Sequence, residues 1–253
     1  MKAGLLETIG IGLSFERKKP VLSDISLRLE EGELVVLAGR NGAGKTVFAK
    51  CLAGLIPPTE GRILFRGRDL REYSGSNATR IAYLYQDARL QILGDTLLDD
   101  VLFGLEARGL GSDEARERAL ESLKSVGLSE MVEARPFELS GGEQRRLAIA
   151  SVLVLDPALL VLDEPFANLD WASIASVLKI LLELRSKGHS LLILTHELDK
   201  LLGAADRLIV FEGGRLAADG APGTVLAAGV EEFGLRDPLR HVASLSELLW
   251  LDP

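Results

Sequence analysis

The chain of 253 residues has a single cysteine, Cys51, and only 5% of its residues are aromatic. One cysteine excludes an intrachain disulfide and fits a reducing compartment. No apolar run approaches the roughly 18 residues that a membrane helix needs, and the N-terminus lacks the apolar core of a signal peptide. With 47% hydrophobic residues and a net charge of −8, these features predict a soluble, cytoplasmic protein with no bulk attraction to nucleic acid.

Apolar residues are spaced in two ways that predict two kinds of β-strand. Apolar and polar residues alternate over 22–30 and 61–70, which is typical of a half-exposed antiparallel sheet. Continuous aliphatic runs occupy 33–39, 158–165 and 190–197. Such runs are typical of parallel strands that are buried on both faces. We therefore expect an antiparallel sheet near the N-terminus and a separate, mostly parallel sheet.

Helical patterns separate these strands. Residues 171–188 carry apolar residues at helical spacing and end at a glycine, and 207–220 predict a hairpin. Residues 87–151 contain no buried-strand run, and 112–127 begin with a serine cap and a charged first turn. We expect a helical insertion there. Strands that alternate with helices indicate an α/β fold.

The segment "GRNGAGKT" matches the phosphate-loop pattern G-x-x-x-x-G-K-[ST], directly after a buried strand and at the start of a helix. Its glycines let backbone N–H groups approach the β- and γ-phosphates of a nucleotide. Its lysine supplies a positive charge, and its threonine hydroxyl can ligate Mg²⁺. The predicted nucleotide-binding residues are Gly39, Arg40, Asn41, Gly42, Ala43, Gly44, Lys45 and Thr46.

A second buried strand ends in the acidic pair Asp163 and Glu164. An aspartate at the carboxyl end of a strand beside the phosphate loop can hold Mg²⁺ through water. The adjacent glutamate can accept a proton from an attacking water molecule. A solvated strand end would explain either residue alone, but the phosphate loop favours a catalytic pair.

A second glycine-rich turn, "LSGGEQRR", also opens a helix. Ser140 and Glu143 have the spacing of a capping box, a purely structural explanation. Gly141 and Gly142 favour a ligand instead, because close approach of a backbone to a ligand needs glycine and a cap does not. A capped helix N-terminus can still present N–H groups to a phosphate.

Taken together, these motifs resemble those of the ATP-binding cassette (ABC) ATPases, and the resemblance covers about residues 5–225. "GRNGAGKT", "YQD", "LSGGEQRR", "VLDEP", "FANLD" and "THE" occur in that family's order. The resemblance implies a P-loop NTPase core and a head-to-tail dimer that holds two ATP molecules with Mg²⁺. Each ATP would lie between the phosphate loop of one chain and the signature, Ser140 to Glu143, of the other.

The resemblance also assigns roles to single residues. Gln86 resembles the glutamine that reaches Mg²⁺ and water, and the alternative is a polar strand end. His196 resembles the histidine that contacts the γ-phosphate and steadies the attacking water. Asp170 resembles the aspartate that crosses the dimer interface.

The sequence departs from the family's pattern at two places. Val47 stands where a second hydroxyl residue often follows the lysine, so nucleotide affinity is expected to be somewhat lower. Arg17 stands where an aromatic residue usually stacks on adenine. A guanidinium can stack on a base, so Arg17 is the candidate, with Phe15 as the alternative unless Phe15 is a core residue.

The segment from Gln86 to Gly104 is similar to energy-coupling-factor importer ATPases, in which such a segment docks membrane partners. We expect a surface lysine at Leu98 or Phe103 to disturb that contact. The matching residues are Gln86, Gln91, Thr96, Asp100, Val101, Phe103 and Gly104, although Leu97 replaces a valine.

The resemblance suggests a division into residues 1–220, with a helical insertion at about 87–151, and a helical extension over 221–253. In the extension, an apolar stripe at helical spacing would contact either its own domain or a second subunit. The stripe consists of Val242, Leu245, Leu248 and Leu249.

These features imply an ATPase subunit that powers uptake of a vitamin or transition metal ion at the cytoplasmic face of the membrane. It would pair with itself or a paralogue and bind a membrane T-component and a substrate-binding S-component, without inserting into the membrane or binding nucleic acid. The alternatives are a cassette ATPase of another importer or an exporter, and a soluble cassette that acts on nucleic acid.

Overall fold

The predicted N-terminal antiparallel sheet is confirmed in the computed structural model, which describes residues 4–15, 20–73 and 81–251. The strands lie in the order β2-β1-β4-β5. The bounds are β1 Gly4–Leu13, β2 Leu22–Glu30, β4 Glu60–Phe65 and β5 Arg68–Asp69. Along β2, buried and more exposed positions alternate, as the sequence pattern predicts.

The second sheet is mostly parallel and has the order β10-β9-β3-β8-β7-β6. Only β10 runs antiparallel to its neighbour, in the predicted hairpin. The bounds are β3 Leu34–Ala38, β6 Ile81–Leu84, β7 Leu159–Asp163, β8 Ser190–Thr195, β9 Arg207–Glu212 and β10 Arg215–Gly220. All residues of β3, β7 and β8 are buried, which explains their continuous aliphatic sequences.

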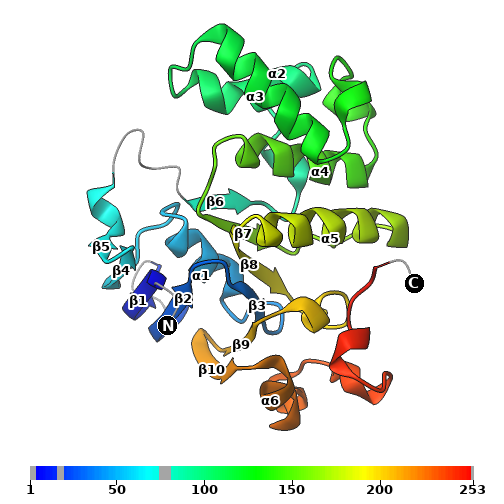
Figure 1. Cartoon of the computed structure of the whole chain (residues 1–253). Helices are drawn as coiled ribbons and strands as arrows, with labels where there is room; N and C mark the ends of the chain where they lie inside the picture. The colour runs from blue at the N-terminus through cyan, green and yellow to red at the C-terminus, as the bar shows by residue number, and fades with distance from the viewer. Residues whose placement is uncertain (1–3, 16–19, 74–80, 252–253) are drawn as a thin grey trace.

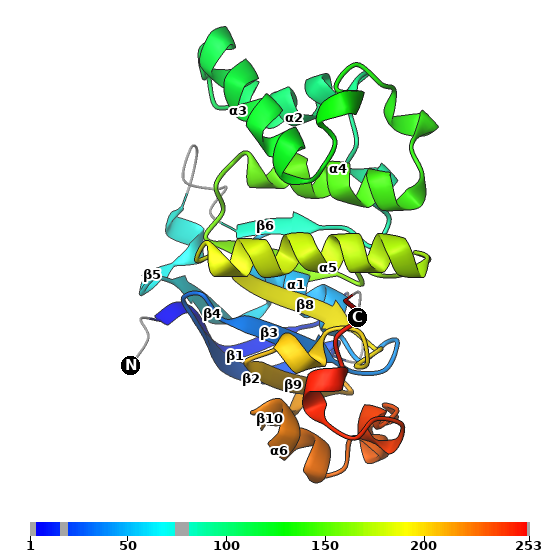
Figure 2. The ribbon, with the colours of Figure 1, turned by 45° about the vertical axis from the view of Figure 1, so that its right-hand side comes forward.

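The parallel sheet separates two hydrophobic cores. On β3, Val35 and Leu37 join a core that contains helix α1, Lys45–Leu52, and the antiparallel sheet. Val36 faces the other core, which contains helix α5, Trp171–Ser186, and the helical insertion. Figure 2 shows α5 running across the sheet. The phosphate loop and the acidic pair therefore each follow a strand that is fixed on both faces.

The helical insertion forms a separate layer above the parallel sheet (Figure 1). It contains α2 Leu97–Glu106, α3 Ser112–Ser125 and α4 Gly141–Leu153. Helix α4 lies closest to the sheet and contacts both β6 and α5. The expected helical insertion is thus confirmed, and α4 carries its glycine-rich turn at the N-terminal end.

The C-terminal segment differs from the helical extension that the sequence suggests. Only α6, Pro222–Ala227, is an α-helix, and 245–247 form a short 3₁₀ turn. The expected helical stripe is therefore wrong, because backbone groups there bond to another segment. Gly203 N donates to Leu248 O (2.8 Å) and Trp250 N donates to Lys200 O (2.9 Å).

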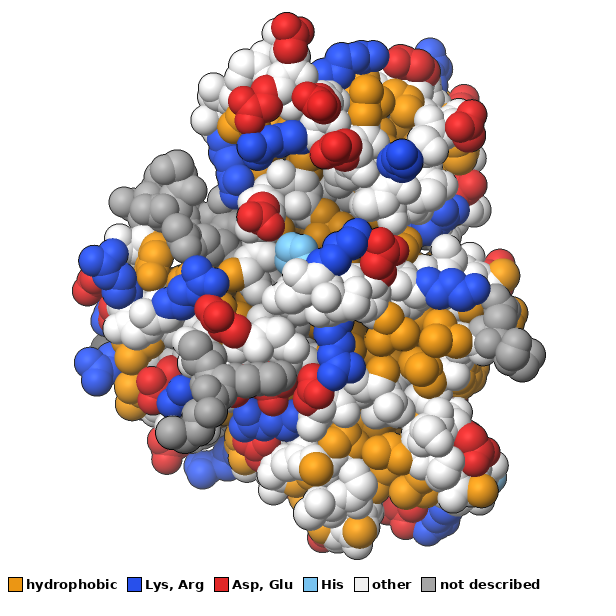
Figure 3. Space-filling model, viewed as in Figure 1, with side chains coloured by type: hydrophobic (Ala, Val, Ile, Leu, Met, Phe, Trp, Pro, Cys, Tyr) orange, Lys and Arg blue, Asp and Glu red, His pale blue; other side chains and the backbone are white. Residues whose placement is uncertain are grey.

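The C-terminal segment packs against its own domain. Leu248 is buried in the second core, with other apolar residues of the segment packed around it. Figure 3 shows hydrophobic side chains gathered on the side where this segment lies. Among the described residues, no helix is long and apolar enough to cross a membrane.

Candidate nucleotide-binding site

Strand register brings three predicted motifs to one edge of the parallel sheet. Ala38 of β3 pairs with Thr195 of β8, and Leu194 of β8 pairs with Asp163 of β7. The residues that follow these strand ends are the start of the phosphate loop, His196 and Glu164. Ligand sites in open α/β sheets lie at the carboxyl ends of the strands.

The phosphate loop is closed around its lysine. Lys45 Nζ donates to the carbonyl oxygens of Gly39 (2.6 Å) and Arg40 (3.3 Å). Burial lowers the pKa of Lys45, while the charges of Glu164 and Asp163 oppose that shift. The acidic pair and the lysine thus lie at the same edge of the parallel sheet, as the strand register also shows.

Glycine is required at Gly39 and Gly44 for different reasons. A Cβ on Gly39 would lie 2.5 Å from Phe211 O, and Gly44 has a φ of +99°, a region that disfavours side chains. Arg40, Asn41, Gly42 and Thr46 are exposed, whereas Ala43 is buried. Val47 is partly buried and packs against the first core. The Thr46 hydroxyl is available to a ligand.

Asp163 is held by a hydrogen bond that the sequence analysis did not foresee. Tyr83, on β6, donates from its hydroxyl to Asp163 Oδ2 (2.7 Å), and both residues are buried. Burial raises the pKa of Tyr83, and the Asp163 carboxylate raises it further. Tyr83 therefore remains a donor at all physiological pH values. The tyrosine contacts only Oδ2, which leaves the second carboxylate oxygen, Oδ1, to face a ligand.

Glu164 and His196 form a contact pair. His196 Nδ1 lies 2.8 Å from Glu164 Oε1, and an ionised carboxylate can only accept, so Nδ1 carries the proton. The backbone of Glu164 is left-handed, with a φ of 46°, and its N–H donates to Leu194 O (3.0 Å). A non-glycine residue in this region is strained and persists only where its surroundings fix it. Here the neighbouring strand β8 does so.

The signature turn contains the capping box that its spacing predicts. Ser140 Oγ accepts from Glu143 N (3.3 Å), and Glu143 Oε2 accepts from Ser140 N (2.8 Å) and Ser140 Oγ (2.7 Å). These bonds from Ser140 lower the pKa of Glu143. Part of the motif is thus explained within the chain.

The two glycines of the signature have different explanations. A Cβ on Gly142 would lie 2.3 Å from Ser173 Oγ and 2.7 Å from Ser173 Cβ, so α5 requires glycine there. On Gly141 it would meet Leu169 Cδ2 at an ordinary 3.7 Å. Packing against α5 therefore explains Gly142 within the chain, and the expectation that both glycines serve a ligand stays a prediction. No contact within the described chain explains Gly141.

Gln86 lies in an exposed loop that the signature helix holds by its backbone. Arg145, buried on α4, donates from Nη1 to Tyr85 O (2.7 Å) and from Nη2 to Gln86 O (2.5 Å). Burial lowers the pKa of Arg145. The Gln86 side chain is exposed. A movement of α4 would therefore carry this loop with it.

The remaining predicted residues lie at the margins of the site. Asp170 is the N-cap of α5 and accepts from Ser173 N (2.8 Å), a bond that lowers the pKa of Asp170. Phe15 is 47% exposed, so it is not a core residue. Arg17 lies outside the described residues. Within the described part of the chain, no hydrogen bond or ion pair joins the signature turn to the phosphate loop.

The sequence from residue 22 to residue 167 matches the protein family described as ABC transporter. That match includes the phosphate loop, the signature and the acidic pair, whose geometry is given above. The chain belongs to the ABC transporter family. As an ABC ATPase it is an enzyme that hydrolyses ATP, in a family that couples hydrolysis to transport.

Known ABC ATPases resemble this chain in sequence and fold. The Fe(3+) ions import ATP-binding protein FbpC of Rhizobium etli is 42% identical over 213 residues, 84% of this chain and 60% of that protein. CbiO1 from Clostridium perfringens, part of the ABC transporter complex cbiONQ, has a TM-score of 0.82 and 29% identity. That match covers 98% of this chain and 99% of the other.

A third relative shows how such cassettes assemble. The ATP-binding cassette MJ0796, solved as a dimer in a post-hydrolysis state with ADP and Pi, has a TM-score of 0.76 and 25% identity. The match covers 86% of this chain and 99% of the other. ABC ATPases thus bind adenine nucleotide, form dimers and work within membrane transport complexes.

Sequence reasoning missed two residues at the site of this ABC ATPase, Tyr83 and Arg145. Tyr83 occupies an inward position of a buried strand. A buried tyrosine hydroxyl needs a hydrogen-bond partner, so the sequence could have pointed to a polar contact here. Arg145 follows the signature in a predicted helix, where a charged residue is expected to be exposed. Its buried position was not predictable without the position of β6.

Proposed function

We propose that this ABC ATPase drives an energy-coupling-factor-type importer for a vitamin or a transition metal ion. It acts at the cytoplasmic face of the membrane, paired with itself or a paralogue, and binds a T-component that assembles with a substrate-binding S-component. The pattern of residues from Gln86 to Gly104 and the likeness to cbiO1 of the cbiONQ complex support this assignment.

Hydrolysis would use the residues at the carboxyl edge of the parallel sheet. Lys45 and the loop N–H groups hold the β- and γ-phosphates, and Thr46, Asp163 and Gln86 supply oxygen atoms that suit Mg²⁺. Mg²⁺, when bound, neutralises charge on the phosphates. Because His196 holds Oε1 of Glu164, Oε2 remains to accept the proton of the attacking water.

The signature would serve the nucleotide of a second subunit. Within the described part of the chain, a Cβ on Gly141 would meet only Leu169 at an ordinary distance, so packing does not require glycine there. This observation favours a head-to-tail dimer in which the Gly141 backbone meets a γ-phosphate. Arg17 or Phe15 would stack on adenine, and Asp170 would reach the opposite subunit.

A Ser140→Arg substitution tests this arrangement. It should leave ATP binding to the monomer nearly intact while it blocks dimer closure and hydrolysis. Loss of the cap costs about 1 kcal/mol, so circular dichroism must first show a folded chain. Loss of ATP binding by the folded monomer would show that the signature serves its own nucleotide.

A group of exposed large apolar side chains on the helical insertion also supports the docking proposal. Leu90 is 70% exposed, Leu93 65%, Phe103 56% and Phe137 73%. Phe137 and Ile92, which lies between the two leucines in sequence, line a hollow of about 1060 Å³. Exposed apolar groups around a hollow are typical of a binding surface.

The residues of the importer pattern shape this surface. Asp100 Oδ1 accepts from Leu93 N (2.6 Å) and Gly94 N (3.0 Å), which fixes the loop that exposes Leu93. Thr96 caps α2 in a capping box with Asp99. The expectation that Leu98 is a surface residue is wrong, because it is only 4% exposed.

Phe137→Lys or Phe103→Lys should abolish copurification with the membrane T-component and reduce substrate uptake, with basal hydrolysis by the isolated subunit retained. Leu120→Lys is the matched control, since Leu120 is an exposed apolar residue on α3 that lies outside both the 86–104 segment and the lining of the hollow. If no T-component copurifies and both phenylalanine variants sustain uptake, the importer assignment fails.

A different ABC importer is the second candidate, favoured by the 42% identity to the ferric-ion import protein FbpC. It would use the same catalytic residues and the same hollow with a different membrane protein. Identification of the copurifying membrane subunit by mass spectrometry separates the two candidates.

A further inference from the structure

A polar cavity of about 540 Å³ lies at the edge of the parallel sheet opposite the phosphate loop. Its lining includes Ala158, just before β7, and Ser190, the first residue of β8. These strands run from the cavity to the Asp163–Glu164 pair and to His196 at their other ends. The cavity is therefore separate from the proposed ATP site.

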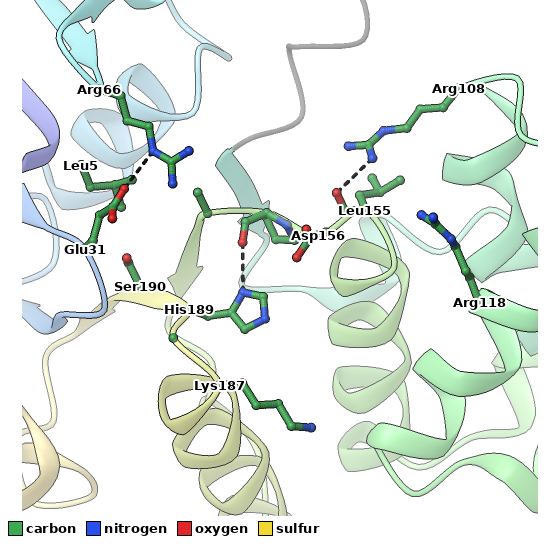
Figure 4. A pocket seen from close by; sticks show the side chains of 13 residues that line it. Leu5, Glu31, Arg66, Arg108, Arg118, Leu155, Asp156, Lys187, His189 and Ser190 are labelled. Carbon is green, nitrogen blue, oxygen red and sulfur yellow. Dashed lines mark hydrogen bonds and ion pairs between the residues drawn. The ribbon is translucent and has the colours of Figure 1, made fainter. Parts of the chain in front are cut away.

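Basic side chains from three parts of the fold surround this cavity (Figure 4). Arg66 comes from the turn of the antiparallel sheet, and Arg108 and Arg118 come from the helical insertion. Lys187 follows α5 in the parallel core. Acidic groups in the lining are Glu31 and Asp156. This concentration of cations contrasts with the net charge of −8 of the chain.

Three of the cations form exposed ion pairs, and Arg66 also lies over the ring of Phe65. Arg66 Nε lies 2.9 Å from Glu31, Arg118 lies 2.8 Å from Glu114, and Lys187 lies 2.7 Å from Glu183. Ion pairs between exposed side chains contribute about 0–1 kcal/mol. Each cation can therefore turn from its carboxylate to a ligand in the cavity at little cost.

Arg108 is less free to move and marks the inner wall. Its Nη1 donates to Leu155 O (3.0 Å). Burial lowers the pKa of Arg108, Asp156 opposes this shift, and the charge of Arg118 lowers it further. Both guanidinium groups line the cavity, so an anion between them would relieve their mutual repulsion.

We propose that this cavity binds a phosphate-type oxyanion, which Arg108 and Arg118 of the helical insertion share with Lys187 and Arg66. Guanidinium groups suit this class of ligand because their N–H donors match the spacing of phosphate oxygens. Leu155, which forms part of the wall, lies two residues after the end of α4.

Such an anion would join the helical insertion to the rest of the domain. Helix α4 spans 13 residues, or about 20 Å, from the signature turn to this cavity. The bound anion would hold the C-terminal end of α4 and so fix the direction in which Ser140 and Gly141 face a second subunit. The cavity would therefore act as a regulatory site.

The test is titration of inorganic phosphate into the full-length chain by calorimetry, with sodium chloride at equal ionic strength as the reference. The Lys45→Ala variant removes the lysine of the phosphate loop and should retain binding in the cavity. In that background, Arg118→Glu and Lys187→Glu should each weaken binding at least tenfold. Arg116→Glu, which makes the same charge change on α3 away from the cavity, should change it less than twofold.

Three results would overturn the proposal. They are absence of phosphate binding to the wild-type chain, complete loss of binding in folded Lys45→Ala, and equal effects of Arg118→Glu and Arg116→Glu. None of them bears on the importer assignment, because the measurement uses neither a membrane partner nor hydrolysis.

Discussion

Substitution of Gly142 by alanine should destabilise the chain, whereas the same change at Gly141 should not. The added Cβ at position 142 would lie 2.3 Å from Ser173 Oγ and 2.7 Å from Ser173 Cβ. Rotation of the serine can move Oγ but not Cβ, so the N-terminal turns of α4 and α5 must separate. Overpacking of this kind costs about 1–3 kcal/mol.

The size of the effect follows from a double-mutant cycle. Ser173→Gly removes both close atoms and leaves Ser173 Cα at 3.6 Å as the nearest neighbour. The second substitution should therefore recover most of the stability lost by Gly142→Ala, apart from about 1 kcal/mol for a glycine in a helix. We expect a coupling energy of about 1–3 kcal/mol.

Urea unfolding of the wild-type chain, the two single variants and the double variant measures this coupling. In thermal unfolding, the midpoint temperature should move by about 2–4 °C for each kcal/mol in a chain of this size. Gly141→Ala is the matched control, with a nearest contact of 3.7 Å. It should keep wild-type stability but lower the hydrolysis rate of the dimer. If Gly142→Ala is as stable as Gly141→Ala, the steric explanation of the signature is wrong.

Three further predictions concern the carboxyl edge of the sheet and the core. Glu164→Gln should abolish phosphate release but retain ATP in a stable dimer, and normal turnover would remove Glu164 as the base. Tyr83→Phe should raise the Mg²⁺ concentration needed for half-maximal hydrolysis and cost about 1–3 kcal/mol of stability. An unchanged Mg²⁺ titration would mean that Asp163 does not need the hydrogen bond from Tyr83 to hold the ion. Burial raises the pKa of Cys51 to about 11, so a thiol reagent at pH 8 should label it only in urea. The pKa of Cys51 is higher in the folded chain than in the unfolded chain. The contribution of the neutral thiol to stability is therefore fully present below about pH 9 and is lost as the pH rises towards 11, which unfolding midpoints measured over that range would show.

The parts of the fold that the sequence predicted are those with a local pattern. The strand from Leu34 to Ala38 is aliphatic throughout because both of its faces are covered. The phosphate loop and the capping box of Ser140 are fixed by residues close in sequence, so their spacing was sufficient to predict them.

The parts that escaped prediction depend on distant contacts. Tyr83 and Asp163 are joined across neighbouring strands, and Arg145 reaches the loop at Gln86 from another layer. The apolar spacing of the C-terminal segment indicated a helix. Its backbone instead forms hydrogen bonds with Lys200 and Gly203, and no local sequence pattern predicts these distant partners.

The position of β3 in the middle of the parallel sheet has a consequence for synthesis of the chain. Both of its neighbours, β8 and β9, come from the last third of the sequence. The bond from Leu34 N to Asp206 spans 172 residues. During translation, the phosphate loop therefore leaves the ribosome long before the two strands that flank β3 have been synthesised. Because helices α2 to α4 pack mainly on one another, they can fold first on the nascent chain, and nucleotide binding should arise only near the end of translation.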